Sequence, residues 1–176
     1  ITMFINTLVR VFSAVKMVLD HAAVTKQCEA DLSGLVQDTT TFAHVTNYPV
    51  VVSDVYCAGF ASAFRGYIIL SQGMYAMYLR GEERDYIEAF VKHEEGHHVL
   101  GHTSVSDFKA CLTATSQHEY TQREYEADEY SYMHGYDMAG ALAHVKPAAV
   151  YMHGPEVGDL IDDRIDRLHT LDILPY

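Results

Sequence analysis

The chain has 176 residues, of which 24 are acidic and 12 are basic, so its formal net charge is −12. Hydrophobic residues make up 49%, which suits one buried core and excludes a disordered chain. The negative charge argues against nucleic-acid binding, and three cysteines without a paired spacing exclude a disulfide framework. We therefore expect a single domain over residues 1–176 in a reducing, cytoplasmic compartment.

Residues 1–40 are predicted to form a helical segment ahead of the core of the domain. Phe4, Leu8 and other apolar residues repeat at helical spacing, whereas Arg10 and Lys16 make this stretch too charged for a transmembrane span. We expect an amphipathic helix packed on the domain. The alternative is peripheral contact with a membrane through the same helix.

Two short apolar runs, at residues 49–52 and 67–70, are rich in valine and isoleucine and predict strands of a small sheet. A loop rich in threonine precedes the first run. The alternating residues 48–56 favour an edge strand, because an edge offers unpaired backbone groups to an extended peptide. The alternative is a strand that is paired on both sides.

The most informative motif is HExxH, formed by His93, Glu94 and His97 inside an amphipathic helical pattern. Residues four apart lie on one face of a helix, so both imidazoles can bind one divalent metal ion. The glutamate between them can reach a water on that metal and take its proton. This arrangement is typical of zinc hydrolases.

Three further residues of this helix deserve a prediction of their own. Gly96 costs about 1 kcal/mol in a helix relative to alanine, which suggests that another element packs very close to it. His98 and His102 are also four apart, but valine follows His98, so they do not repeat the motif. We expect these two histidines behind the ligands or on the surface, with the solvated surface favoured.

A third ligand is expected from a second helix, over about residues 117–134. Glu124 and Asp128 share one face of it, so one carboxylate can bind the metal while the other holds a ligand imidazole through its free N–H. Spacing alone does not choose Glu124 over Glu119. The remaining acidic residues, Glu126 among them, suit an ordinary solvated helix face.

The sequences HEEGH and EYEAD together resemble the gluzincin peptidases of family M-48, which include HtpX-like heat-shock proteases and CaaX prenyl proteases. Weaker likenesses at residues 135–137 and 163–168 extend the resemblance over residues 45–170. It implies an α+β, zincin-like fold, mainly helical, with a small sheet next to the HExxH helix. It also implies one Zn²⁺ per chain, Glu124 as the third ligand and Asp128 as its supporting residue.

The C-terminal part is predicted to form two helices broken near Pro147 and Pro155. The resemblance places a histidine and an arginine from this part near the cleft, which here would be His153 and Arg164. Either could stabilise the negative charge of the tetrahedral intermediate. The alternatives are a solvated histidine, and an arginine paired with a neighbouring acid such as Asp163.

The sequence therefore predicts a zinc-dependent endopeptidase that acts on a protein or peptide substrate. Glu94 would be the general base for a metal-activated water and then the acid for the leaving amine. One alternative is a regulatory metallopeptidase with a single protein target, similar to the IrrE-like enzymes. Another is a non-catalytic zinc-binding interaction module, which would close the metal with a fourth protein ligand.

Overall fold

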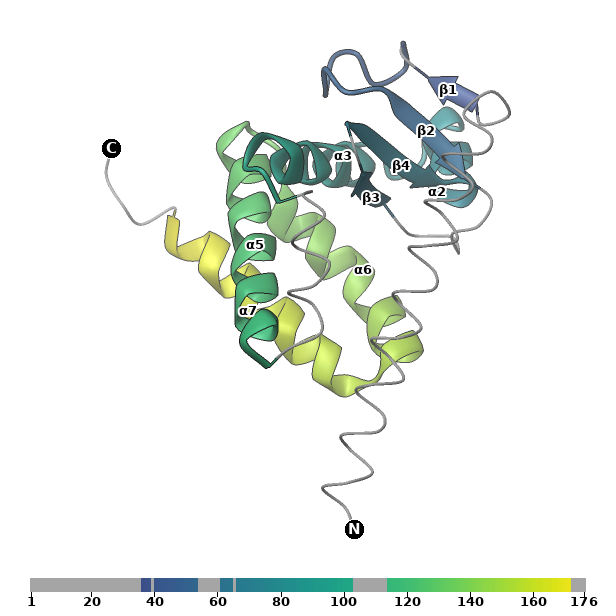
Figure 1. The fold of residues 1–176 in the computed structure, drawn as a ribbon. Coiled ribbons are helices and arrows are strands. Elements are labelled where there is room, and N and C mark those ends of the chain that lie inside the picture. Colours follow the sequence, from purple (N-terminus) through teal and green to yellow (C-terminus); the bar gives the residue numbers. More distant parts are fainter. Residues whose placement is uncertain (1–35, 39, 54–60, 65, 103–113, 172–176) are drawn as a thin grey trace.

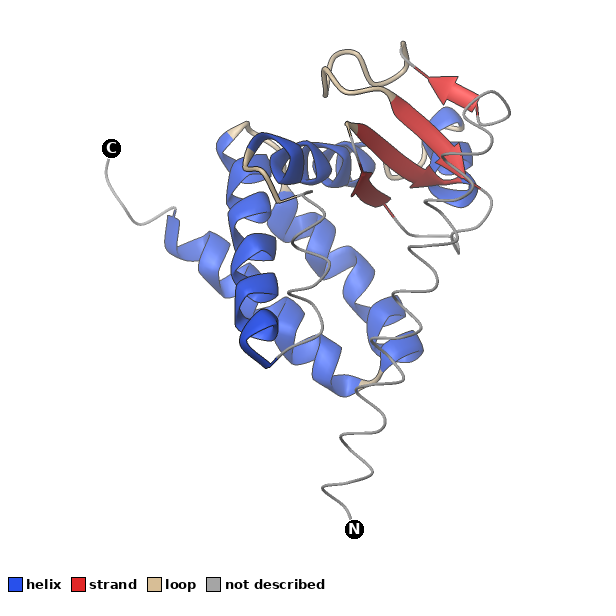
Figure 2. Cartoon of the chain, viewed as in Figure 1, coloured by secondary structure: helices blue, strands red, loops and turns tan. Residues whose placement is uncertain are grey.

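The computed structural model describes residues 36–38, 40–53, 61–64, 66–102 and 114–171 (Figure 1). The predicted N-terminal amphipathic helix lies outside these residues, and the prediction of a helical segment over residues 1–40 is wrong at residues 36–38, which form a strand. The described part is an α+β structure in which a small sheet stands beside a larger group of helices (Figure 2). Its elements are β1 (Val36–Asp38), β2 (Val50–Ser53), β3 (Ala61–Phe64), β4 (Tyr67–Ser71), α2 (Gln72–Leu79), α3 (Arg84–Val99), α5 (Ala114–Met133), α6 (Met138–His153) and α7 (Pro155–Leu171).

The sheet has the strand order β1-β2-β4-β3. β2 pairs with β1 in antiparallel fashion and with β4 in parallel, while β3 and β4 form an antiparallel pair. The strands predicted at residues 49–52 and 67–70 are thus confirmed as β2 and β4. The prediction of an edge strand at residues 48–56 is wrong, because β1 occupies the second edge of β2. On the other side of the sheet, β3 is the outer strand.

A first hydrophobic core fills the space between the sheet, α2 and α3. β-Branched and other large apolar side chains point into it, because alternate residues of a strand share one face. Ser71 begins α2 by accepting a hydrogen bond from the backbone N–H of Met74, at 3.2 Å. The buried members of this core are Phe42, Val45, Val50, Ile68, Leu70, Met74, Tyr78, Ile87 and Val91.

α3 stands between this core and a second one formed with α6 and α7. Ile87 and Val91 face the sheet side, whereas Ala89 belongs to the second core, so α3 is apolar on two sides. Although α3 has several charged residues, it is stabilised by packing against both hydrophobic cores. The buried members of the second core are Ala89, Met138, Ala141, Leu142, Ile161 and Leu168.

α6 and α7 form an antiparallel pair that α5 crosses (Figure 1). Pro155 begins α7, where the lack of an N–H costs nothing. The prediction that Pro147 would break a helix is wrong, because α6 runs through it. Pro147 and Ala143, whose carbonyl loses its helical partner, are both on the exposed side of α6, where water can satisfy that carbonyl.

None of the helices in the described part of the chain combines the length and the apolar character that a membrane crossing requires.

Candidate metal centre

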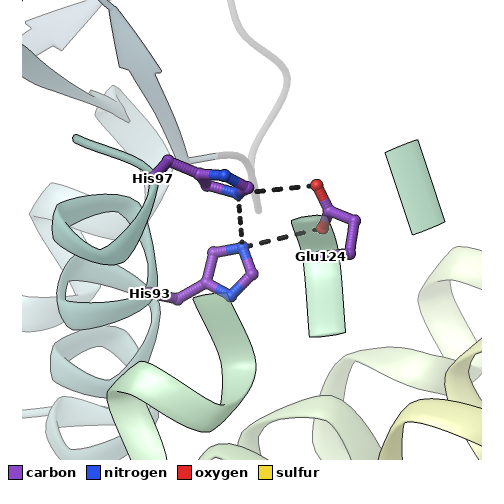
Figure 3. Close-up of side chains that lie close together, drawn as sticks. All are labelled: His93, His97 and Glu124. Carbon is purple, nitrogen blue, oxygen red and sulfur yellow. Dashed lines mark hydrogen bonds and ion pairs between the residues drawn. The ribbon is translucent and has the colours of Figure 1, made fainter. Parts of the chain in front are cut away.

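Three side chains from two helices converge at the interface of α3 and α5 (Figure 3). The Nε2 atoms of His93 and His97 are 3.1 Å apart. One oxygen of Glu124 lies 3.6 Å from Nε2 of His93, and the other lies 3.5 Å from Nε2 of His97. α3 supplies both imidazoles from one face, and α5 supplies the carboxylate opposite them. The chain thus has a group of three side chains that could hold a metal ion.

The spacing of these atoms fits a small divalent ion. Ligands arranged tetrahedrally at about 2.0–2.1 Å from zinc lie about 3.3–3.4 Å from one another. The two histidine nitrogens, 3.1 Å apart, are close to that value, and each lies 3.5–3.6 Å from a different oxygen of Glu124. Two imidazoles and a carboxylate are also the donor set of catalytic zinc sites that keep a fourth position open. The residues present therefore fit a small divalent metal ion, and their donor atoms suit zinc.

His93 is supported from behind by Asp128, as the sequence predicted. Its Nδ1 lies 2.8 Å from an oxygen of Asp128, and both side chains are almost completely buried. The contact is close, but the two groups are not aligned as a good hydrogen bond. With its Nδ1–H facing this carboxylate, His93 leaves Nε2 free to bind a metal.

Arg164 of α7 holds Asp128 in place. Its Nε and Nη2 donate to the two carboxylate oxygens of Asp128 at 2.6 and 2.7 Å, and its Nη1 lies 3.2 Å from Glu124. Two parallel hydrogen bonds of this kind are strong and fix the geometry of both groups. The guanidinium is thus paired with α5 and not with Asp163, which is exposed on α7. His153 is exposed at the end of α6 and is not among the residues that converge here.

His97 is supported by a pair of residues that sequence reasoning assigned to the surface. Its Nδ1 lies 3.1 Å from Nδ1 of His102, and Nε2 of His102 lies 3.0 Å from Glu126. Gln122 donates to the other oxygen of Glu126 at 2.9 Å. The side chain of His102 is only 9% exposed. The signal that could have identified it is the glycine at position 101, which turns the chain back over the helix end.

His98 is the second histidine that the sequence predicted to lie either behind the ligands or on the surface. It is half-buried and faces the sheet. Its Nε2 lies 2.8 Å from the backbone oxygen of Tyr67, and its ring stacks on Tyr48 at 4.5 Å. The favoured prediction of a solvated surface therefore fails for both His98 and His102. Glu119, the other acid considered as third ligand, is exposed on α5.

Glu94 is buried next to the ligand pair, at 8% exposure. Within the described part of the chain, no hydrogen bond or ion pair engages its carboxylate. Its neighbour Glu95 is different, because Lys92 binds that carboxylate at 2.7 Å. Of the two consecutive glutamates, Glu94 is therefore the one left available for proton transfer.

Gly96 brings the two ligand helices together, as its presence in a helix suggested. A Cβ atom placed on it would lie 3.1 Å from Cβ of Tyr130 and 3.2 Å from Cα of Ala127, which is tighter than ordinary contacts. Nearby, the hydroxyl of Ser131 donates to the backbone oxygen of Ala89 at 2.9 Å. These contacts fix the separation of α3 and α5, on which the distance from Glu124 to the histidines depends.

Neighbouring charges outweigh the effect of burial on the pKa of two of the ligands, Glu124 and His93. Burial alone would raise the pKa of Glu124, but His97, His93 and Arg164 outweigh it and hold that pKa well below its usual range. Burial would lower the pKa of His93, but Asp128 and the nearby glutamates reverse this and raise it. Glu124 is therefore ionised, as a metal ligand must be.

Comparison of the chain with family models, curated proteins and solved structures finds no match.

Proposed function

We propose that the chain is a zinc-dependent endopeptidase of gluzincin type with a zincin-like fold. The observation that carries the proposal is the convergence of His93, His97 and Glu124, with Glu94 buried in the same helix as the two histidines. The resemblance of HEEGH and EYEAD to the gluzincin peptidases supports the same assignment. The α+β arrangement, with the small sheet packed against the HExxH helix, agrees with the fold that this resemblance implies.

Zinc held by these three residues would lower the pKa of a water and polarise the carbonyl of the scissile peptide. Glu94 has the position of a general base, because it follows His93 by one residue and, among the described residues, no hydrogen bond or ion pair holds its carboxylate. As the water oxygen bonds to the carbonyl carbon, Glu94 takes the proton. It then delivers that proton to the amide nitrogen, and the C–N bond breaks.

The outer strand β3 is the place where an extended substrate could add to the sheet. It is the last strand in the order β1-β2-β4-β3, and it packs beside α3. His98 ties the end of α3 that carries His97 to Tyr67, which pairs with Phe64 of β3. A complex with a peptide inhibitor should therefore show backbone hydrogen bonds to Ala61–Phe64.

The number of ligands argues against a purely structural zinc module. A structural site is closed by four protein ligands, whereas three converge in the described part of the chain. Both nearby histidines point elsewhere, His102 onto His97 and His98 onto a backbone oxygen. An intact Glu94 would also have no purpose in a structural site.

Metal analysis tests the ligand set. Wild type should hold one zinc per chain, and Glu124→Ala should lose it while Glu119→Ala keeps it. Glu119 is the matched control, because it is an exposed glutamate on the same helix. Loss of zinc in Glu119→Ala alone would contradict the assignment of the third ligand.

Identification of new protein termini, with wild type against Glu94→Gln, tests the reaction. The variant should keep zinc and fold, but lose a factor on the order of 10²–10⁴ in rate. Termini confined to one protein would favour the regulatory form of the peptidase, and termini from many proteins a general one. Equal turnover by wild type and Glu94→Gln would refute the proposed mechanism.

A further inference from the structure

We propose that His102 is a positioning residue for the metal centre: the turn that ends α3 places its ring on His97 and fixes which nitrogen of His97 is free to bind the metal. This inference rests on the proposed metal site, and it adds a residue that the HExxH and EYEAD motifs do not contain. Three features carry it: the geometry of the helix end, the direction of the hydrogen bonds and the burial of the ring.

The helix end is a Schellman motif. The backbone N–H of His102 donates to the oxygen of His97 at 2.8 Å, and that of Gly101 donates to the oxygen of His98 at 3.2 Å. Gly101 has φ +76°, in the left-handed region that glycine adopts without strain. In this motif the residue after the glycine lies back over the residue that accepts its N–H. The backbone alone therefore places His102 next to His97.

The hydrogen bonds then have one consistent direction. Glu126 is an acceptor, so Nε2 of His102, 3.0 Å away, carries the proton. In neutral His102 this leaves Nδ1 as an acceptor, and it faces Nδ1 of His97 at 3.1 Å. Nδ1 of His97 must then be the donor, which leaves its Nε2 bare. Nε2 is the atom that faces His93 and Glu124.

Burial gives this arrangement its strength. The side chain of His102 is 9% exposed, so water competes poorly for its ring nitrogens. Glu126 is 40% exposed, and Gln122 orients it with a hydrogen bond from the same helix. The ring of His102 is thus the buried link between an exposed carboxylate and a metal ligand.

Two substitutions of His102 separate the tautomer effect from simple packing. The oxygen of an asparagine can take the place of Nδ1 and still accept from His97, but asparagine does not reach Glu126. Glutamine reaches Glu126 but has no acceptor at the position of Nδ1. We expect His102→Ala and His102→Gln to weaken zinc binding by about tenfold to a hundredfold, as loss of such supporting groups commonly does. His102→Asn should lose clearly less.

Zinc affinity is measured by competition with a chelator, and the site itself is followed by the visible absorption of the Co²⁺-loaded protein. His98→Ala is the matched control, since His98 is another histidine near the end of α3, but its ring faces Tyr67 and not His97. It should lower thermal stability without changing the zinc affinity or the Co²⁺ spectrum. A shifted spectrum in His102→Ala, with an unchanged one in His98→Ala, supports the inference.

Equal zinc affinity of wild type and His102→Ala would overturn the inference and leave the proposed function standing. An asparagine variant as weak as the alanine variant would overturn the tautomer argument. Absence of divalent metal binding by wild type would overturn both the inference and the proposed function.

Discussion

The two histidine ligands come from one turn of the same helix, yet they are supported in opposite ways. Behind His93 stand Asp128 and Arg164, a fully charged pair in which Asp128 is 1% exposed. Behind His97 stands His102, an uncharged ring in this arrangement, followed by Glu126, which is 40% exposed. The first support crosses from α3 through α5 to α7, whereas the second stays at one helix end and one face of α5.

This difference separates stability from metal binding. A buried charge pair costs much when one partner is removed, because the other charge remains without compensation. A neutral ring beside a half-exposed carboxylate can be removed at lower cost to the fold, since water reaches the carboxylate. Substitutions of the residues that contact His93 should therefore destabilise the fold, and substitutions of those that contact His97 should mainly weaken the metal site.

The largest effect is expected for Asp128→Asn. It removes the negative charge that faces His93 and Arg164, and leaves Glu124 as the carboxylate paired with Arg164. We expect the free energy of unfolding of the metal-free protein to fall by about 3–5 kcal/mol, the usual range for a broken buried pair. Urea denaturation measures this. Asp163→Asn, an exposed acid on α7, should leave stability unchanged, and a loss as large there would contradict the argument.

Arg164→Met should also destabilise the metal-free protein, by about 3 kcal/mol. The sequence-based hypothesis made Arg164 a donor to the reaction oxyanion, which would lower kcat and leave stability intact. The structure gives it three contacts to Asp128 and Glu124 instead. In a double-mutant cycle, Arg164→Met should cost clearly less in the Asp128→Asn background. Additive losses would show that Arg164 and Asp128 do not stabilise the fold as a pair, whereas a fall in kcat alone would favour the role in catalysis.

Substitutions of two glycines test the contact between His102 and His97, with a smaller expected loss of stability. α3 and α5 both end in a Schellman motif, with Gly101 at φ +76° and Gly135 at φ +86°. An added Cβ atom meets nothing within 4 Å at either position, so alanine introduces backbone strain alone. Gly101→Ala and Gly135→Ala should each cost about 1 kcal/mol of stability.

Only Gly101→Ala should also weaken zinc binding, because only that turn carries His102 onto His97. The turn at Gly135 carries Tyr136, which packs against both hydrophobic cores. Chelator competition on the two variants gives the comparison. Equal zinc affinity of both variants would show that the placement of His102 does not depend on the turn.

The sequence predicted the parts of the centre that follow from helical spacing. The pair His93 and His97, and the shared face of Glu124 and Asp128, depend only on the i, i+4 rule. Gly96 indicated that another helix packs close. The choice of Glu124 over Glu119 needed the resemblance, because it depends on how α5 lies against α3.

The missed features are those that long-range contacts decide. His102 and Glu126 are 24 residues apart, and no local pattern brings them together. Arg164 reaches Asp128 across 36 residues, so a neighbour in the sequence was the wrong partner to consider. β2 was predicted at an edge because its own alternation does not show that the preceding strand, β1, pairs with it. Sequence spacing shows which residues share one face of a helix, whereas the contacts between different helices depend on how the helices pack.

The smallest effect is expected for Tyr78→Phe, which changes a polar contact of the sheet-side core and leaves both histidine supports intact. The hydroxyl of Tyr78 donates to Glu88 at 2.7 Å, a bond worth about 1 kcal/mol. Burial and this bond raise the pKa of Tyr78 above its usual range. The folded protein therefore favours the neutral phenol. Its contribution is present in full below the unfolded pKa of about 10, and it decreases as the pH rises above that value.

Urea denaturation of wild type and Tyr78→Phe, at neutral pH and at pH values above about 10, measures this contribution. Wild type should be more stable by about 1 kcal/mol at neutral pH, and the difference should shrink in alkaline solution, because only the wild type must keep a buried phenol protonated. Tyr151→Phe is the matched control, since Tyr151 is 91% exposed; it should show no difference at any pH. Zinc affinity should be unchanged in both variants. A weaker metal site in Tyr78→Phe would show that the sheet-side core also positions the ligands, and that the two histidine supports are not independent of it.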